Sequence, residues 1–396
     1  MKALTRLAGF KYLGRRRVLA LVVILALSSA LFSMTAFSLL GFYRGFTAYL
    51  GEGGDVVVVY DRRSHTPFTG LVPAYLAERI SALNGVLACS PEAIAPCAVK
   101  GEPVFLRGIL PESFAKLNQL TMIEGGMLEP GDLNYAIVGR SAAERLHVRL
   151  GDRVLALGVL TDRYVELQVK GVFASRSPMD DEILAPLHVG QWLRGADYGH
   201  VTLIRFRIDR DVLTPSRVFE EVAKEASEPS PPPSVAPGQP PLGIAPRMMV
   251  GFRAEDVGVE EAYSFMRSYL DRYGVTRESL LILSAMVFLL SGVSVALASR
   301  TIMAQHKDEV SVLRSLGASR RLLKRDVLIK LLPWSLAASS MGLALATLAL
   351  TAIQERGYLR VLSHSIAFRL DPLAVALNFI LVLTLVSVGV LKAELE

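Results

Sequence analysis

The sequence predicts an α-helical membrane protein with four transmembrane helices and a large mixed α/β extracytoplasmic domain inserted between helices 1 and 2. Three observations predict this fold class. The mean hydropathy of +0.39 is high for a soluble protein. Four uncharged, largely apolar runs each reach the length of about 18 residues that a membrane-spanning helix needs. A block of mixed composition, residues 44–278, separates the first two runs and is long enough for a globular core.

The order of charged and uncharged segments gives the domain organisation. The predicted transmembrane helices are 18–43, 279–299, 331–354 and 372–391. The segments outside them are the basic N-terminal segment 1–17, the extracytoplasmic domain 44–278, the cytoplasmic loop 300–330, the short external loop 355–371 and the cytoplasmic tail 392–396. The first run is longer than the apolar part of a signal peptide, so we expect an uncleaved anchor rather than a cleaved leader.

Lysine and arginine near the span ends predict the orientation, because positive residues collect on the cytoplasmic side. Residues 1–17 carry only basic charges, and the loop 300–330 carries eight basic residues against three acidic ones. We therefore expect a multi-pass protein of the cell (plasma) membrane, with both termini cytoplasmic and the large domain extracytoplasmic. The formal net charge of +6 then comes from basic residues that orient the chain in the membrane, where lipids surround it. No nucleic-acid partner is expected.

The interiors of the four predicted spans contain no Asp, Glu, Lys, Arg or His. They therefore lack the buried relay of an ion-coupled carrier and the polar pair of an intramembrane enzyme. Gly292 and Gly342 permit close contact between helices. Four polar residues could hydrogen-bond between helices, namely Ser335, Ser339, Ser340 and Asn378. Asp371-Pro372 has the pattern of a helix start, with aspartate as the N-cap.

Within the block 44–278, the sequence pattern mixes strands and helices. Apolar runs and alternation predict strands over 55–60, 104–110, 136–138, 153–160, 165–173 and 201–208. Helical spacing of apolar residues predicts helices over 74–83 and 216–226. An inserted subdomain is expected over about 90–200, a proline-rich insertion at 228–246, and an outward stalk continuing the second span at 260–277.

The only two cysteines, Cys89 and Cys97, both fall in the extracytoplasmic block. A disulfide can persist outside the cell, and this spacing can close a small loop, so a disulfide and two free thiols are both open. Two cysteines without a neighbouring histidine make a poor metal site, and we expect no bound metal.

The motifs of common enzyme classes are absent from the sequence. It has no Gly-Lys-Ser/Thr phosphate loop, no serine-nucleophile elbow and no zinc-protease histidine pair. The six histidines are dispersed, and we expect each to be an ordinary surface or core residue. The cluster Asp180-Asp181-Glu182 is expected to be a solvated turn, with a cation site as the alternative. We therefore expect a non-catalytic protein with no catalytic residues and no cofactor of its own.

The cytoplasmic loop 300–330 carries the most informative pattern. Val310, Leu313 and Leu316 form one apolar stripe on a short amphipathic helix. Gly317 suits the C-cap of that helix, and Ser319 suits the N-cap of the next. The stripe must rest either on the membrane interface or in a protein groove.

This loop, together with the topology, resembles the FtsX/MacB/LolC-type ABC transporter permeases. The loop residues that carry the resemblance are Glu309, Val310, Val312, Leu313, Arg314, Leu316, Gly317, Ala318 and Ser319. External segments that also look like the family's are 104–111, 124–128, 138–154 and 169–173. The large outer block favours the MacB-like branch, because FtsX proper has a far smaller outer domain. Unlike MacB proper, this chain is expected to have its ATPase on a separate chain.

The resemblance implies a permease subunit whose loop residues 309–319 dock on a separate ABC ATPase subunit, which binds the ATP. It also implies a dimer with a second permease copy or a paralogue. ATP hydrolysis would then move the extracytoplasmic domain, for export or for mechanotransmission. The alternatives are a membrane-anchored sensor or scaffold and an FtsX-like regulator of an extracellular hydrolase. The sequence has no recognisable kinase, methyl-acceptor or long cytoplasmic output domain that would support the sensor hypothesis. The sequence does not identify the cargo.

Overall fold

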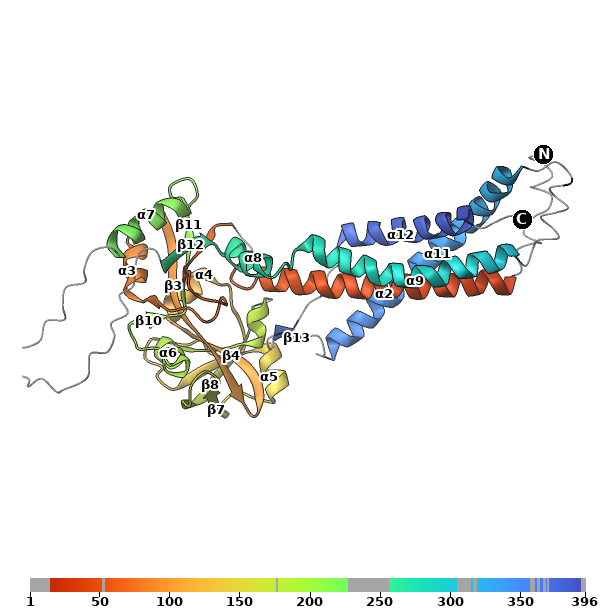
Figure 1. Cartoon of the computed structure of the whole chain (residues 1–396). Coiled ribbons are helices and arrows are strands. Elements are labelled where there is room, and N and C mark those ends of the chain that lie inside the picture. The colour runs from red at the N-terminus through yellow and green to blue at the C-terminus, as the bar shows by residue number, and fades with distance from the viewer. Residues whose placement is uncertain are drawn as a thin grey trace, which may run out of the picture. The chain divides into compact units, whose positions relative to one another are not determined.

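The computed structural model divides the chain into two units (Figure 1). The helical unit comprises Met1–Arg44, Gly274–Leu359 and Ile366–Glu396, and the α/β unit comprises Gly45–Tyr273 and Arg360–Ser365. The residues that the structure describes are 15–51, 54–175, 177–226, 256–304, 315, 319–356, 360–361, 364–365, 368 and 370–392. The predicted proline-rich insertion at 228–246 and nearly all of the basic segment 1–17 lie outside these residues.

Four long helices make up the described part of the helical unit. They are α2 (Arg15–Thr47), α9 (Arg277–Ala304), α11 (Arg320–Glu355) and α12 (Pro372–Lys392). Among the described residues, three helical segments are long and apolar enough to cross a membrane, namely Leu19–Thr47, Val327–Glu355 and Pro372–Leu391. The predicted second span, 279–299, lies within α9, which is not one of these three, so the number of four spans stays a prediction.

Small residues bring the helices of this unit close together. A Cβ atom added at Gly342 of α11 would lie 2.3 Å from the carbonyl oxygen of Ala26 on α2. A Cβ atom added at Gly292 of α9 would lie 2.8 Å from Leu385 on α12. The structure thus confirms that both glycines permit close helix contact.

The α/β unit is built on a ten-stranded mixed sheet with the order β12-β1-β11-β3-β4-β9-β6-β8-β5, in which β7 pairs with β3 and β8. The strands are β1 (Val56–Asp61), β3 (Val86–Val99), β4 (Glu102–Ile109), β5 (Thr121–Gly125), β6 (Tyr135–Gly139), β7 (Arg153–Gly158), β8 (Tyr164–Ala174), β9 (Ile183–Pro186), β11 (Leu203–Ile208) and β12 (Val257–Glu261). The pairs β4–β9 and β6–β8 are parallel, and the others are antiparallel.

Helices and two small sheets surround the large sheet. The helices are α3 (Tyr75–Ser81), α4 (Pro111–Leu117), α5 (Arg140–Leu146), the 3₁₀ helix η1 (Pro178–Asp181), α6 (Leu187–Arg194), α7 (Pro215–Ala226) and α8 (Ala262–Arg272). The small sheets are β2 (Val72–Pro73) with β10 (His200–Val201), and β13 (Arg360–Val361) with β14 (His364–Ser365). The structure confirms a strand or helix at each position that the sequence predicts for this block, except that the predicted strand 201–208 is divided between β10 and β11.

Strand β1 shows why the sheet needs helices on both faces. Its residues Val57 and Val59 join a core with side chains of α3 and α7, whereas Val56, Val58 and Tyr60 join a second core with side chains of α8. Successive side chains of a strand point to opposite faces, so an unbroken valine run must be covered on both.

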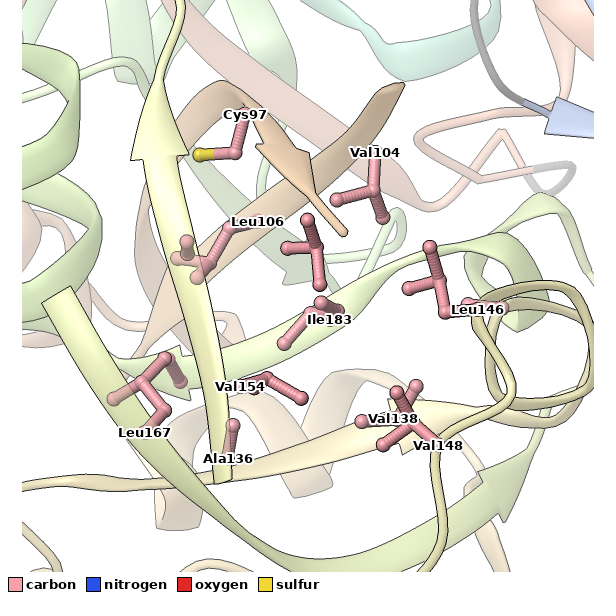
Figure 2. Close-up of a cluster of buried hydrophobic side chains, with 14 of the residues drawn as sticks. Cys97, Val104, Leu106, Ala136, Val138, Leu146, Val148, Val154, Leu167 and Ile183 are labelled. Carbon is pink, nitrogen blue, oxygen red and sulfur yellow. The ribbon is translucent and has the colours of Figure 1, made fainter. Parts of the chain in front are cut away.

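A third core fills the other half of the sheet (Figure 2). Its ten labelled residues are Cys97, Val104, Leu106, Ala136, Val138, Leu146, Val148, Val154, Leu167 and Ile183. All members of this core fall between Ala95 and Leu193. That range lies inside the predicted subdomain over about 90–200, whose existence as a separate subdomain stays a prediction.

Strand β3 is the main element that the sequence did not predict. Its first half, from Val86 to Glu92, pairs with β11, and its second half, from Ala93 to Val99, pairs with β4. Pro91 and Pro96 lie within it, and proline in the interior of a strand normally argues against that assignment. The strand forms because neighbouring strands and cores on both sides outweigh the two missing donors.

The disulfide between Cys89 and Cys97 is contradicted by this strand, and both thiols are free. The two cysteines lie eight positions apart on β3. At about 3.3 Å per residue, an extended strand holds their Cα atoms roughly 26 Å apart. A disulfide needs Cα atoms within about 7 Å.

The predicted stalk over 260–277 is also wrong. Glu260 and Glu261 belong to β12, and α8 is a separate helix of the α/β unit whose Phe265 ring lies 4.1 Å from that of Tyr60. Helix α8 does not continue into the next helix, because the backbone at Gly274 is left-handed, with φ at +70°. The next helix, α9, then starts anew, since Thr276 and Ser279 exchange backbone-to-side-chain hydrogen bonds of 2.9 and 3.1 Å, the pattern of a capping box.

The free thiols give a testable prediction. Burial raises the pKa of Cys89 and that of Cys97 to about 12 each, so very little thiolate exists at pH 8. We expect iodoacetamide to alkylate neither thiol readily in the folded protein and both after denaturation without reductant. Intact-mass measurement checks this result. A denatured, unreduced protein that takes up no label would restore the disulfide.

Candidate functional site

The predicted ATPase-coupling residues lie almost entirely outside the described part of the chain. Those outside are Glu309, Val310, Leu313, Arg314, Leu316, Gly317 and Ala318. Ser319 is described and is exposed, and it directly precedes α11, which begins at Arg320. This is the position expected of an N-cap, but the coupling role of the segment stays a prediction.

A chain of four charged side chains is buried in the α/β unit. Arg107 donates two hydrogen bonds to Glu182, from Nε to Oε2 at 2.7 Å and from Nη2 to Oε1 at 3.0 Å. Its third nitrogen, Nη1, donates to Oε2 of Glu92 at 2.6 Å. The other oxygen of Glu92 accepts from Nε of Arg205 at 2.7 Å. The side chains of Glu182, Arg107 and Glu92 are 0% exposed and that of Arg205 is 3% exposed, so the charges alternate in a nearly water-free interior.

Strand pairing brings these residues together from distant parts of the sequence. Arg107 on β4 lies opposite Ile94 of β3, and Glu92 of β3 lies opposite Leu203 of β11, which also carries Arg205. Glu182 follows η1 and directly precedes β9, the parallel neighbour of β4. The chain thus crosses the middle of the sheet, where all three strands β11, β3 and β4 depend on it.

The two ends of the charged chain are satisfied by polar groups. Nη1 of Arg205 donates to the carbonyl oxygen of Leu50 at 2.8 Å, and Nη2 donates to Oδ1 of Asn118 at 3.2 Å. At the other end, the hydroxyl of Tyr49 donates to Oε1 of Glu182. The ring of Tyr49 also lies 4.9 Å below the guanidinium of Arg107. Buried charges are tolerated when every one is paired and hydrogen-bonded in this way.

The last partner of Glu182 comes from the loop between α11 and α12. Nε2 of His364 on β14 lies 3.1 Å from Oε1 of Glu182. The imidazole is stacked on Phe105, with ring centroids 5.3 Å apart, and meets Tyr49 edge-on at 5.1 Å. Its side chain is 12% exposed. Residues Arg360–Ser365 therefore complete the α/β unit, although they follow its other residues by a long stretch of sequence.

The electrostatics keep Glu182 and Arg107 ionised. Burial opposes ionisation of Glu182, but the charge of Arg107 and the hydrogen bonds from His364 and Arg107 outweigh it, so the pKa of this carboxyl lies well below its usual range. Burial likewise opposes the charge of Arg107, but Glu182, Tyr49 and Glu92 outweigh it and raise the arginine's pKa. Both groups are charged at neutral pH.

A second ion cluster lies within the helical unit, at Asp371. Nη2 of Arg44, in the last turn of α2, donates to this carboxylate at 2.7 Å, and Nη2 of Arg277, at the start of α9, donates at 2.9 Å. The same carboxylate caps α12, because its Oδ1 accepts from the backbone N–H of Leu373 at 2.9 Å. The structure confirms Asp371 as the N-cap and adds that it joins the ends of three helices.

A neutral polar cluster joins α2, α11 and α12. Oγ of Ser29 lies 3.0 Å from Oδ1 of Asn378, and Nδ2 of Asn378 donates to Oγ of Ser339 at 2.9 Å. Ser29 also donates to the carbonyl oxygen of Ser339 at 3.1 Å. The predicted hydrogen bonding between helices is confirmed for Ser339 and Asn378, and Ser29 is the partner that the sequence did not reveal. Ser335 instead donates to Leu331 of its own helix.

The sequence misjudged one residue of the charged chain, Glu182. Asp180-Asp181-Glu182 is not a solvated turn, because Asp181 and Glu182 are 3% and 0% exposed and Glu182 pairs with Arg107. His364 was expected to be an ordinary surface or core histidine, and its 12% exposed side chain, 3.1 Å from Glu182, agrees with a core position. One signal was available for the chain, since Arg107 and Arg205 stand within strongly apolar strands, where an arginine needs a carboxylate partner.

The described residues offer little for a metal or cofactor. They include no group of three His, Cys, Asp or Glu side chains that could hold a metal ion. One pocket of about 640 Å³ lies between α4 and α6, with Leu110, Glu112, Leu187 and Tyr198 in its wall. Asp132, which also lines this pocket, is paired with Lys170 at 2.6 Å.

Glu182 gives a pH prediction. Its pKa is lowered on folding, so its contribution to stability is present above the unfolded value near 4.5 and is lost as the pH falls below it. We expect Glu182→Gln to destabilise the α/β unit by roughly 3–5 kcal/mol at pH 7, because Arg107 loses half of its buried counter-charge. The loss should stay constant from pH 7 down to about 4.5 and shrink as the pH is lowered further. Unfolding of the full chain in detergent, followed at several pH values, measures both effects.

The matched control for this prediction is Glu124→Gln, which changes an exposed glutamate on β5 of the same unit. This control should leave the free energy of unfolding within about 0.5 kcal/mol of wild type. Equal stability of the two variants would show that the charged chain does not stabilise the unit.

Two family models match the sequence. The MacB-like periplasmic core domain matches residues 18–218, and the FtsX-like permease C-terminal domain matches residues 281–391. The first match alone covers half of the chain, and together the two leave out mainly the segment 219–280. A comparison with curated proteins finds no match.

Three solved structures are similar to parts of this chain. The periplasmic region of MacB from Actinobacillus actinomycetemcomitans is 12% identical, with a TM-score of 0.36, over 54% of this chain and 92% of that one. The extracellular domain of the noncanonic ABC-type transporter YknZ from Gram-positive bacteria is 15% identical, with a TM-score of 0.34, over 43% and 91%. A domain of a putative permease from Porphyromonas gingivalis is 13% identical, with a TM-score of 0.30, over 43% and 82%.

These TM-scores are too low to carry an argument about fold, so the assignment rests on the two sequence models. One model matches the first apolar helix with most of the α/β unit, and the other matches the three helices that follow. This order is the one that the resemblance of the loop and the topology predicts. The chain therefore belongs to the FtsX/MacB-like family of ABC transporter permeases.

Proposed function

We propose that this protein is the permease subunit of an ABC transporter and couples ATP hydrolysis on a separate ATPase subunit to movement of its α/β unit. The observation that carries this proposal is the covalent path between the two units. The chain passes from the helical unit to the α/β unit after Arg44 and returns before Gly274. Arg44 and Arg277 at these two crossings both bind Asp371. A shift of α12 therefore acts on both ends of the α/β unit at once.

The proposal includes the orientation and the partners. Both termini and the loop 300–330 face the cytoplasm, where a basic connector can meet an ATPase. The α/β unit lies outside the cell membrane and works in export or in mechanotransmission. A second permease copy or a paralogue completes the assembly, because ABC transporters of this family work with paired subunits. The ATPase subunit binds the ATP, and this chain supplies no catalytic group.

The coupling loop gives the test of this proposal. The apolar stripe with Leu313 should rest in a groove of the ATPase, where a carboxylate has no partner. We expect Leu313→Asp to reduce co-purification of the ATPase with the tagged permease at least tenfold. Membrane insertion, followed by fractionation and by protease protection of the α/β unit, should be unchanged.

The matched control is Leu313→Met, which keeps an apolar side chain of similar volume and should retain the ATPase. Gly317→Asp should behave like Leu313→Asp, since it alters the turn that the sequence predicts at the end of the stripe. Full retention of the ATPase by both aspartate variants would exclude this loop as its docking site. Failure of the wild-type chain to capture any ATPase would overturn the proposed function as a whole.

A further inference from the structure

We propose that the loop between α11 and α12 is a clamp on the α/β unit, with His364 seated on the buried charged chain, and that withdrawing this histidine loosens the middle of the sheet. The inference rests on the proposed function, because it names the segment through which helix movement reaches the α/β unit. It adds a role for one short loop and one histidine. It also assigns two states to the α/β unit, one clamped and one released.

The seat of His364 is built from aromatic rings around a carboxylate. Phe105 stacks on the imidazole at 5.3 Å, and Tyr49 meets it edge-on at 5.1 Å. Phe68 closes the group, with its ring 5.2 Å from that of Phe105 and 5.3 Å from that of Tyr49. Glu182 lies at the base, 3.1 Å from Nε2. A planar ring with an N–H donor fits this seat in both shape and hydrogen bonding.

The stretch of sequence from His364 to Asp371 is short, and both of these residues have bonded partners. Seven residues after His364, Asp371 binds Arg44 and Arg277 in the helical unit. Seven residues span at most about 25 Å when fully extended. If the start of α12 moves so far that the distance from Asp371 to the seat of His364 exceeds this span, the connecting residues must pull on His364. The two-residue strands β13 and β14 give the loop a small hairpin of its own, so the pull reaches the ring through a paired backbone.

Withdrawal of the ring would weaken the charged chain without abolishing it. Glu182 would keep Arg107 and Tyr49 as partners but lose one hydrogen bond. Phe105 and Tyr49, now 8% and 5% exposed, would lose the ring that covers them, and water would reach the carboxylate. Water at a buried ion pair weakens its attraction, since the local dielectric constant rises. The strands that should loosen first are β4, which carries Arg107, and β9, which follows Glu182.

The first experiment uses the wild-type chain in lipid nanodiscs with its co-purifying ATPase. Diethyl pyrocarbonate modifies accessible histidines, and mass spectrometry reads each site separately. We expect His364 to react about tenfold more slowly than His200 without nucleotide, and at least fivefold faster after trapping with ATP and vanadate. His200 is the internal control, because it also pairs with a carboxylate, Asp197, but is 36% exposed. An unchanged rate at His364 in a complex that hydrolyses ATP would overturn the clamp.

The second experiment measures amide hydrogen exchange in 102–109 and 183–186, the segments of β4 and β9. In wild type we expect exchange there to rise at least fivefold on ATP–vanadate trapping. In His364→Ala it should be raised already without nucleotide and should show no further rise. His364→Gln, which keeps a donor at a similar position, should restore most of the nucleotide response. His200→Ala should behave as wild type.

The outcomes separate the clamp from the proposed function. If the ATPase binds and hydrolyses ATP but His364→Ala keeps the full nucleotide-dependent rise in exchange, the clamp is wrong and the transporter assignment stands. If His364 were only structural, His364→Ala would raise exchange equally with and without nucleotide. The nucleotide-dependent rise would then remain. If His364→Ala does not accumulate, the wild-type footprint and His364→Gln still decide the question. If no ATPase binds, the proposed function itself fails.

Discussion

A buried charge is stable only when opposite charge and hydrogen bonds replace the water that it has lost. In the α/β unit this requirement links Glu182, Arg107, Glu92 and Arg205 into one chain, in which no member can move without taking a charged partner from its neighbour. The chain crosses β11, β3 and β4, so it fixes the register at the middle of the sheet. The apolar cores on either side could tolerate small shifts, because their contacts are not directional. The charged chain could not, and it makes the arrangement specific.

The sequence predicted what depends on local pattern. Valine runs and alternation located the strands, and Asp371-Pro372 located the start of α12, because hydrophobic period and capping act over a few residues. Strand β3 was not predicted, because Pro91 and Pro96 argue locally against a strand. The pairing with distant strands outweighs this local preference. The pairing within the charged chain was not predicted for a related reason. Arg107 and Arg205 within apolar strands signal that carboxylate partners exist, but only the sheet order identifies those partners as Glu92 and Glu182.

The candidate site was predictable in part. Asp371 was correctly predicted as a helix cap. The coupling role of the loop 309–319, inferred from its stripe and its resemblance to a family, stays a prediction. The partners of Asp371 were not predictable, since Arg44 and Arg277 are far from it in sequence and mark only the edges of apolar runs. His364 was hidden most completely. It lies in a short polar loop between two apolar helices, where a histidine has no local pattern to distinguish it.

The division of the chain has a practical consequence for experiments on the excised domain. The α/β unit draws Arg360–Ser365 from beyond the long helix α11. A soluble fragment cut at Gly45 and Tyr273 would therefore omit the imidazole beside Glu182 and leave the aromatic seat open to solvent. Such a fragment is a different molecule at its centre from the domain in the intact protein. Supplying the missing hairpin as a fused C-terminal peptide would restore the native composition of the seat.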